Sequence, residues 1–312
     1  MIDPEARAYL EATAALGLPS LAVQGPVAAR RHNHDRAPSL AGPVEQVALV
    51  EDGALPGPGG PIPFRRYSPA PERALPVLLY MHGGGWVYGD IDTHDSVCRA
   101  LARRAECAVV SLDYRLAPED PFPAAVEDAW AGMQWLHAHA SAIGGDPHRI
   151  AVAGDSAGGN LAAVLALRAR DRGGPRIAAQ VLIYPVTDCD LDTASYGEAA
   201  TGYGLTSESM FWFWDNYIAD AGRRRDPDAS PMRATHHRNL APALVITCEL
   251  DPLASEGIAY AELLKQSGVT VQHFHELGMI HGYIRTAGVT SRTRKSWEDI
   301  ARFLRAAFES GD

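Results

Sequence analysis

The sequence has few cysteines, and they are too scattered to staple a fold. Its 312 residues include four cysteines, and no two of them form a Cys-x-x-Cys pair. This spacing argues against a disulfide framework and a zinc knuckle, and it favours a reducing compartment. A chain of this length buries enough surface to form a core without covalent staples. We therefore expect a core held by packing alone.

Long apolar runs and an excess of positive charge are also missing. No apolar stretch approaches the roughly 20 residues that a membrane-spanning helix needs. Residues 1–7 include acids and lack the apolar core of a secretory signal. The 28 Lys and Arg residues against 38 Asp and Glu residues give a formal net charge of −10. An acidic balance argues against nucleic acids and anionic membranes as partners. We predict a cytoplasmic protein that binds neither.

Strand-like and helix-like segments alternate through most of the chain. Short apolar runs predict buried strands, and the segments between them have the apolar spacing of helices. The predicted strands cover residues 77–80, 107–112, 150–153, 177–184, 244–249 and 269–275, and the predicted helices cover 94–105, 124–139, 161–170, 258–266 and 293–308. An antiparallel strand pair, 44–50 and 62–67, precedes them. This order predicts an α/β fold with a mostly parallel central sheet and helices on both faces.

Two stretches do not follow this alternation. Residues 4–17 have the spacing of an amphipathic helix, whereas residues 22–43 look irregular. Residues 187–239 hold the aromatic run Phe211–Trp214, whose spacing is typical of a helix packed over a cavity. We expect one structural unit whose helical cap consists of residues 1–43 and 188–239 and whose catalytic core consists of residues 44–187 and 240–312.

A serine at the centre of a Gly-x-Ser-x-Gly frame lies between a predicted strand and a predicted helix. Gly154 and Gly158 flank Ser156 in this frame. A strand that turns sharply into a helix leaves no room for Cβ atoms beside its central residue, and glycines relieve that crowding. Gly and Ser also form ordinary turns, so the strand before and the helix after are the stronger signal. Together they predict the nucleophile elbow of the α/β-hydrolase fold.

Three successive glycines follow another predicted strand, in the segment His82–Trp86. Glycines allow backbone N–H groups to point into a cavity. Ester hydrolysis needs such donors for the oxyanion of the tetrahedral intermediate, and one donor lowers the barrier by roughly 3–4 kcal/mol. We predict that the N–H groups of Gly83, Gly84 and Ala157 form this oxyanion hole. A flexible loop is the alternative, and the flanking His and Trp argue against it.

A serine nucleophile needs a base, and the base needs an orienting carboxylate. Asp251 directly follows a predicted strand, whereas its nearest competitor, Glu249, lies inside the apolar end of that strand. His281 lies in a glycine-flanked loop after the last predicted strand. The order Ser, Asp, His along the chain is that of α/β-hydrolases. We predict Ser156, Asp251 and His281 as the catalytic triad.

The other histidines have simpler interpretations. His273 and His275 alternate on one face of a predicted strand, which suits a half-buried structural role. His32 and His34 form a His-x-His segment, but no third residue is spaced to complete a metal site. We therefore predict no metal site.

With these motifs, the chain resembles the hormone-sensitive lipase family of bacterial esterases and lipases. Residues 82–86 match its oxyanion motif, 154–159 its nucleophile motif, and 251–253 and 281–282 its acid and base motifs. Residues 113–119 resemble a further signature, which we interpret as structural. The resemblance implies an α/β-hydrolase core with a cap, carboxylic ester substrates, and neither metal nor organic cofactor. It also suggests a homodimer, because some members form dimers.

The predicted activity is hydrolysis of short- to medium-chain acyl esters through an acyl-enzyme. Trp86, Tyr184, Phe211 and Trp212 are the residues expected to wall the substrate pocket, with packing of the cap onto the core as the alternative for each. A ligand-binding, receptor-like module on the same fold is a second hypothesis, and the presence of His281 argues against it. A third keeps the triad but changes the bond to a lactone, amide or thioester.

Overall fold

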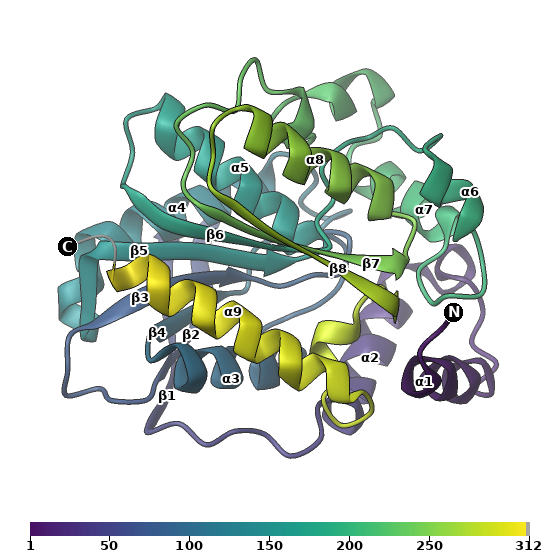
Figure 1. The fold of residues 1–312 in the computed structure, drawn as a ribbon, viewed down its shortest axis with the longest axis horizontal. Helices are drawn as coiled ribbons and strands as arrows, with labels where there is room; N and C mark the ends of the chain where they lie inside the picture. Colours follow the sequence, from purple (N-terminus) through teal and green to yellow (C-terminus); the bar gives the residue numbers. More distant parts are fainter. Residues whose placement is uncertain (310–312) are drawn as a thin grey trace.

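One eight-stranded sheet runs through the protein, which a computed structural model describes for residues 1–309 (Figure 1). Its strands are β1 (Leu49–Gly57), β2 (Gly60–Ser68), β3 (Leu75–Met81), β4 (Ala108–Leu112), β5 (Gly145–Asp155), β6 (Ile177–Ile183), β7 (Ala243–Leu250) and β8 (Val271–Ile280). Their order across the sheet is β1-β2-β4-β3-β5-β6-β7-β8. β2 pairs antiparallel with both β1 and β4, and the remaining pairs are parallel. The predicted mostly parallel sheet is confirmed.

Helices cover both faces of this sheet. The long helices that pack on it are α3 (Asp95–Ala105), α4 (Ala124–His139), α5 (Ala157–Asp171), α8 (Ala254–Gln266) and α9 (Ser291–Glu309). α3 and α9 lie against one face, and α4, α5 and α8 lie against the other (Figure 1). Such a two-sided arrangement buries the central strands completely, and every residue of β3 is buried.

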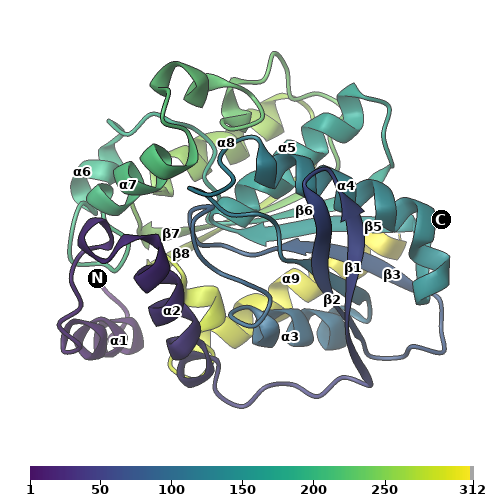
Figure 2. The same ribbon diagram turned by 180° about the vertical axis from the view of Figure 1, so that it is seen from behind.

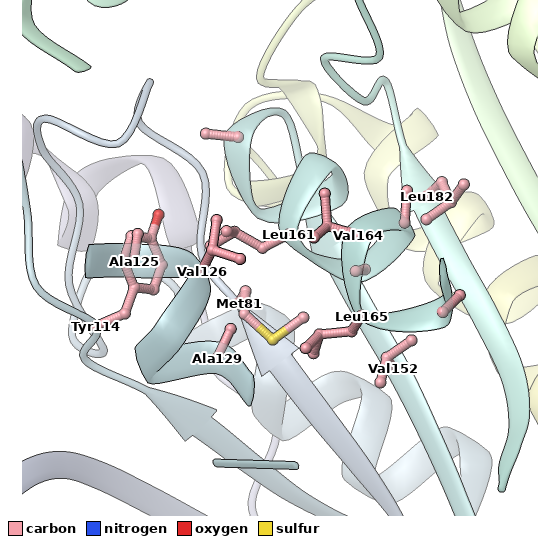
Figure 3. Packing of buried hydrophobic residues seen from close by; sticks show 14 of the residues in the cluster. Met81, Tyr114, Ala125, Val126, Ala129, Val152, Leu161, Val164, Leu165 and Leu182 are labelled. Carbon is pink, nitrogen blue, oxygen red and sulfur yellow. The ribbon is translucent and has the colours of Figure 1, made fainter. Parts of the chain in front are cut away.

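The alternation of side chains along β3 divides the core into two clusters. Val77, Leu79 and Met81 belong to the cluster that includes α4 and α5. Leu78 and Tyr80 belong to the cluster that includes α3 and α9. Successive residues of a strand point to opposite faces, so one strand supplies both clusters. Figure 3 shows the first cluster, with Met81 packed between residues of the two helices.

The segments outside the sheet gather at one end of it (Figure 2). They include α1 (Pro4–Ala14), α2 (Leu21–Ala41), α6 (Ala194–Glu198) and α7 (Ser207–Tyr217), and α2 contacts α7. Two stretches far apart in the sequence therefore lie side by side beyond the carboxyl ends of the parallel strands. This is the edge at which ligands bind in open α/β sheets.

The prediction of an irregular segment at residues 22–43 is wrong, because α2 covers most of it. Gly25 has φ 70° and ψ 169°, which kinks the helix one turn after its start. Pro26 follows the kink, a position where a missing N–H costs little. Ala29, Ala37 and Leu40 are buried. Packing of these side chains stabilises a helix whose glycine and prolines argue against it locally.

The first strand pair is also shifted from its predicted position. The pair was expected at residues 44–50 and 62–67, but β1 and β2 extend to Gly57 and Gly60, which face each other across the turn. Pro56 pairs with Pro61 in this ladder. β1 is an edge strand, where prolines and glycines are tolerated because one side of the strand makes no ladder bonds.

Candidate active site

Ser156 lies at the sharp turn between β5 and α5. Its backbone has φ 56° and ψ −119°, a conformation that is strained for residues other than glycine. The turn is crowded: a Cβ atom on Gly158 would lie 2.0 Å from the carbonyl oxygen of Met81. The Ser156 N–H donates to the carbonyl of Ile183 at 2.8 Å, which fixes the turn to β6. The predicted strand–turn–helix context of the nucleophile elbow is present.

The three predicted triad residues meet in one hydrogen-bonded chain. His281 Nε2 lies 2.9 Å from Ser156 Oγ, and His281 Nδ1 lies 2.8 Å from Asp251 Oδ2. Asp251 is fully buried, and its second oxygen accepts from the N–H of Leu253 at 2.9 Å. A carboxylate only accepts, so Nδ1 carries the proton and Nε2 accepts from the Ser156 hydroxyl. This is the arrangement of a general base aimed at a nucleophile.

The competing residues have other partners. Glu249 accepts from the N–H of Gly278 at 2.6 Å, which ties the end of β7 to β8. His273 and His275 both hydrogen-bond to Thr247 Oγ1 at 2.9 Å. These contacts explain the positions of the three side chains without a catalytic role.

The glycine loop after β3 turns toward Ser156, but its first glycine does not supply the expected donor. The N–H of Gly83 donates to Asp155 Oδ1 at 3.0 Å, so the structure contradicts its predicted place in the oxyanion hole. Within residues 1–309, the N–H groups of Gly84, Gly85 and Ala157 have no protein acceptor. Gly84 has φ 126°, and a Cβ atom there would lie 2.0 Å from the carbonyl oxygen of Tyr88.

Asp155, the residue before the nucleophile, is the centre of a buried polar network that the sequence reasoning missed. It accepts from Tyr80 Oη at 2.8 Å and lies 3.2 Å from His94 Nε2, in addition to its bond with Gly83. Burial by itself raises the pKa of Asp155, but attraction to His94 and hydrogen bonds from His94 and Tyr80 outweigh it and lower that pKa. An ionised carboxylate thus holds the glycine loop against the elbow. Its sequence signals were its place just after a predicted strand and its position within the nucleophile motif of residues 154–159.

A cavity of about 440 Å³ opens over these groups. Its floor includes Ser156, His281 and the three glycines, and its walls include residues of α1, α2 and α7. The apolar and aromatic part of the wall comes from Tyr9, Leu18, Leu21, Leu40, Tyr88, Leu205 and Phe213. None of the four aromatic residues predicted for the wall is among the residues that line it.

These four aromatics lie outside the cavity wall. Trp86 is fully buried and stacks on Tyr217 at 4.1 Å between ring centroids. Tyr184 is buried behind His281, with 4.5 Å between the ring centroids. Phe211 is 48% exposed and faces solvent, and Trp212 is half-buried. The aromatic run lies on α7 as predicted, but helical rotation directs Phe213 rather than its neighbours toward the cavity.

The two histidines of the His-x-His segment do not face a common point. His32 Nδ1 lies 2.7 Å from Gln24 Oε1, and His34 Nδ1 lies 2.9 Å from Asp90 Oδ2. His34, Asp90 and Asp92 bring ligand atoms within 4.8 Å of one another, but Asp92 binds Arg65 at 2.7 Å. These ion pairs on the exterior account for the cluster.

Comparisons with known proteins agree with this geometry. A sequence family described as an alpha/beta hydrolase fold matches residues 78–285. The carboxylic ester hydrolase LipN of Mycobacterium tuberculosis is 41% identical, over 98% of this chain and 83% of that protein. The ethyl acetate hydrolase of Pseudomonas putida is 38% identical, over 92% of this chain and 93% of that protein.

A solved structure extends the agreement to the whole chain. The hyperthermophilic esterase of Pyrobaculum calidifontis is 41% identical and superposes with a TM-score of 0.94, over 100% of this chain and 99% of that one. The sharp turn at Ser156, the hydrogen-bonded chain from Asp251 to Ser156 and the glycine loop thus occur in a chain that shares the fold of a solved esterase structure. The chain belongs to the α/β-hydrolase family, in its hormone-sensitive lipase branch.

Proposed function

We propose that this protein hydrolyses short- to medium-chain carboxylic esters, with Ser156 as nucleophile, His281 as base and Asp251 as the orienting acid. The protein is a carboxylic ester hydrolase, as are its named relatives. The observation that carries the assignment of residues is the unbroken chain from Asp251 through His281 to Ser156, with contacts of 2.8 and 2.9 Å. A receptor-like module has no need of a complete triad, so that hypothesis is not favoured.

The proposed reaction has two halves, and His281 transfers a proton in each of them. His281 Nε2 takes the proton of Ser156 as Oγ attacks the ester carbonyl carbon. The C–O bond to the alcohol then breaks, and His281 returns the proton to the leaving oxygen. A water molecule, deprotonated by the same nitrogen, attacks the acyl-enzyme and releases the acid and Ser156. Asp251 keeps the proton on Nδ1 and stabilises the imidazolium in both halves.

The oxyanion hole consists, in this proposal, of the N–H groups of Gly84, Gly85 and Ala157. All three lack a protein acceptor within the described residues. Ala157 is the first residue of α5, so its N–H also lies at the positive end of the helix dipole. Gly85 replaces Gly83 of the sequence-based prediction, because the Gly83 N–H already binds Asp155.

The preference for short to medium acyl chains is supported by the modest volume of the site. α1, α2 and α7, which belong to the segments predicted as a cap, residues 1–43 and 188–239, contribute to the wall of a cavity of about 440 Å³. A relative is named for ethyl acetate, a small ester. Cleavage of lactones, thioesters or amides by the same triad stays an alternative that a substrate panel resolves.

The first test is Ser156→Ala against p-nitrophenyl acetate and butyrate. Loss of the nucleophile from a triad lowers turnover on the order of 10⁶-fold. Ser267→Ala, outside the catalytic cavity, is the matched control and should retain the wild-type rate. Folding is checked by circular dichroism. A folded Ser156→Ala protein with near-normal turnover would refute the proposal.

The expected setting of the enzyme is also part of the proposal. No helix among residues 1–309 combines the length and apolar character needed to cross a bilayer. Cys98, Cys107, Cys189 and Cys248 are all free thiols, which supports a cytoplasmic location. The partner is a small ester, and a homodimer stays a prediction that sedimentation would check.

A further inference from the structure

Two arginines line the catalytic cavity without a carboxylate partner. Arg36 comes from α2, and Arg285 comes from the short 3-10 helix Tyr283–Arg285 that follows His281. Both side chains are half-buried. Other half-buried or buried arginines of this acidic chain bind carboxylates closely, as Arg115 binds Asp128 at 2.7 Å. Within residues 1–309, no Asp or Glu oxygen lies within ion-pair distance of either cavity arginine.

Neutral oxygens hold both guanidinium groups in place. Arg285 donates to Asn33 Oδ1 at 2.6 Å, and Arg36 donates to Thr13 Oγ1 at 2.8 Å. A guanidinium has five N–H donors, so each arginine keeps donors for a further acceptor. The side-chain nitrogen of Asn33, beside Arg285, is buried and has no acceptor among the described residues. The wall therefore has unused donors, and neither of its two guanidinium groups is paired directly with a carboxylate within residues 1–309.

Among the described residues, the acids near the cavity form no ion pair with either arginine. Asp155 is engaged by Tyr80, Gly83 and His94, and Asp251 is buried behind His281. Glu208 also lines the cavity, but it is exposed and forms no ion pair with either arginine. The field of Arg285 reaches the catalytic centre: burial raises the pKa of Asp155, and Arg285 is among the groups that lower it. Two cationic side chains thus line the active site of an otherwise acidic protein.

We propose that the preferred substrates are esters that carry a second, anionic carboxylate, which Arg285 and Arg36 bind while Ser156 attacks the ester carbonyl. This inference rests on the proposed esterase function and names the substrate class. Arginine matches a carboxylate with two parallel N–H···O bonds, and such charge-assisted bonds are about twice as strong as neutral ones. An uncharged ester would leave both guanidinium groups without a counter-ion.

The test compares charged esters with neutral isosteres. Monoethyl succinate against ethyl levulinate places the carboxylate on the acyl side, and 3-acetoxypropanoate against 4-acetoxybutan-2-one places it on the alcohol side. We expect kcat/KM for the charged ester to exceed that of its isostere by roughly tenfold or more in at least one pair, as a charge-assisted hydrogen bond allows. The pair that shows this ratio identifies the side of the ester on which the carboxylate lies.

Variants then assign the effect to the arginines. Arg285→Gln and Arg36→Gln should each lower the charged-to-neutral ratio about tenfold, whereas Arg285→Lys should keep part of it because the charge remains. Arg294→Gln, an exposed residue of α9 outside the cavity, is the matched control and should leave the ratio unchanged. The ratio should also fall as salt is raised.

A purely structural role of the arginines would change both members of a pair equally, so the ratio is the informative readout. The inference is overturned if the wild-type enzyme hydrolyses the neutral esters but shows no preference for any charged one. It is also overturned if the preference survives both Gln variants. Failure of the proposed function is a separate result: the neutral esters would then not be hydrolysed, or Ser156→Ala would not affect them.

Discussion

Two histidine–aspartate pairs lie close to Ser156, and they differ in the partner of the second histidine nitrogen, the one that does not face the aspartate. In the pair His281–Asp251, the nitrogen that faces away from the acid lies 2.9 Å from Ser156 Oγ. In the pair His94–Asp155, the corresponding nitrogen lies 3.0 Å from Thr93 Oγ1, a fixed neighbour in the chain. The first pair ends on the hydroxyl proposed as the nucleophile, and the second ends on a neighbouring threonine.

This difference separates proton transfer from positioning. The His281 ring is 11% exposed and borders the cavity, so it can exchange protons with substrate and water. His94 and Asp155 also line the cavity, but the His94 ring is only 1% exposed and both of its nitrogens have protein partners, Thr93 and Asp155. Asp155 in turn binds the Gly83 N–H and Tyr80. We infer that the pair His94–Asp155 holds the glycine loop at a fixed distance from the elbow. Although it has the same residue types as His281–Asp251, it does not act as a second base.

We expect the greatest loss of turnover from a substitution that breaks the pair His281–Asp251. Asp251→Asn should lower kcat about 10⁴-fold, because an amide favours the wrong imidazole tautomer while the geometry is kept. The acidic limb of the pH–rate profile should also move, since the base loses its counter-charge. Stopped assays with p-nitrophenyl butyrate from pH 5 to pH 9 measure both. A variant with wild-type kcat and an unmoved profile would remove Asp251 from the mechanism.

We expect the next largest loss of turnover from a substitution in the glycine loop, which the pair His94–Asp155 holds in place. Gly84→Ala should lower kcat roughly 10²–10³-fold, the loss of one oxyanion donor. The added methyl group would meet the Tyr88 carbonyl 2.0 Å away and push the loop from Ser156. Gly197→Ala, on α6 with open space around it, is the matched control for a glycine replacement. Equal kcat values for the two variants would exclude Gly84 from the oxyanion hole.

A smaller effect is expected from the second pair itself. Asp155→Asn keeps the shape of the side chain but removes the charge that holds Gly83 and His94, and kcat should fall about 10–10²-fold through misplacement of the loop. KM should change little, and the pH–rate profile should keep its wild-type shape because His281 is untouched. A shifted acidic limb, like that of Asp251→Asn, would show that Asp155 takes part in proton transfer after all.

The smallest effect concerns an acid that has neither role. The pKa of Asp113 is raised to about 6, first by burial and then by the charges of Asp90 and Asp92. Because the folded value exceeds the unfolded one of about 3.9, stability is lost as the pH rises from about 4 to 6. Asp113→Asn should therefore raise the free energy of unfolding by about 1–3 kcal/mol at pH 7 and leave it unchanged near pH 3.5. Urea denaturation at both pH values measures this; a destabilised variant at pH 7 would contradict it.

The same contrast explains what the sequence could predict. Ser156, Asp251 and His281 each follow a strand of a parallel sheet, and strand ends converge at one edge whatever the side-chain detail. Gly83 was misassigned because its N–H binds a carboxylate 72 positions later, a contact that no local pattern contains. The prediction of the pocket wall was wrong for Trp86, Tyr184, Phe211 and Trp212. Which face of a helix turns toward a cavity, and how deeply a loop residue is buried, depend on tertiary packing.

The unexpected helix α2 shows the same limit. Its Gly and Pro residues lower the local preference for helix, and only buried contacts of residues such as Ala37 and Leu40 stabilise it. Because α2 carries Arg36 and Asn33, the charge of the cavity was also out of reach from the sequence. Tertiary packing of α1, α2 and α7 thus sets the wall of the cavity, while the order of the strands brings Ser156, Asp251 and His281 together.

Covalent labelling with a p-nitrophenyl alkylphosphonate, read by intact mass and peptide mapping, tests the assignment of Ser156 as the nucleophile. We expect one adduct per chain, on the oxygen of Ser156, with stoichiometric release of p-nitrophenol, and none in Ser156→Ala. His281→Gln should react far more slowly, because the hydroxyl then lacks its base. Labelling of another residue at equal rate, or of Ser156 at the same rate without His281, would contradict it.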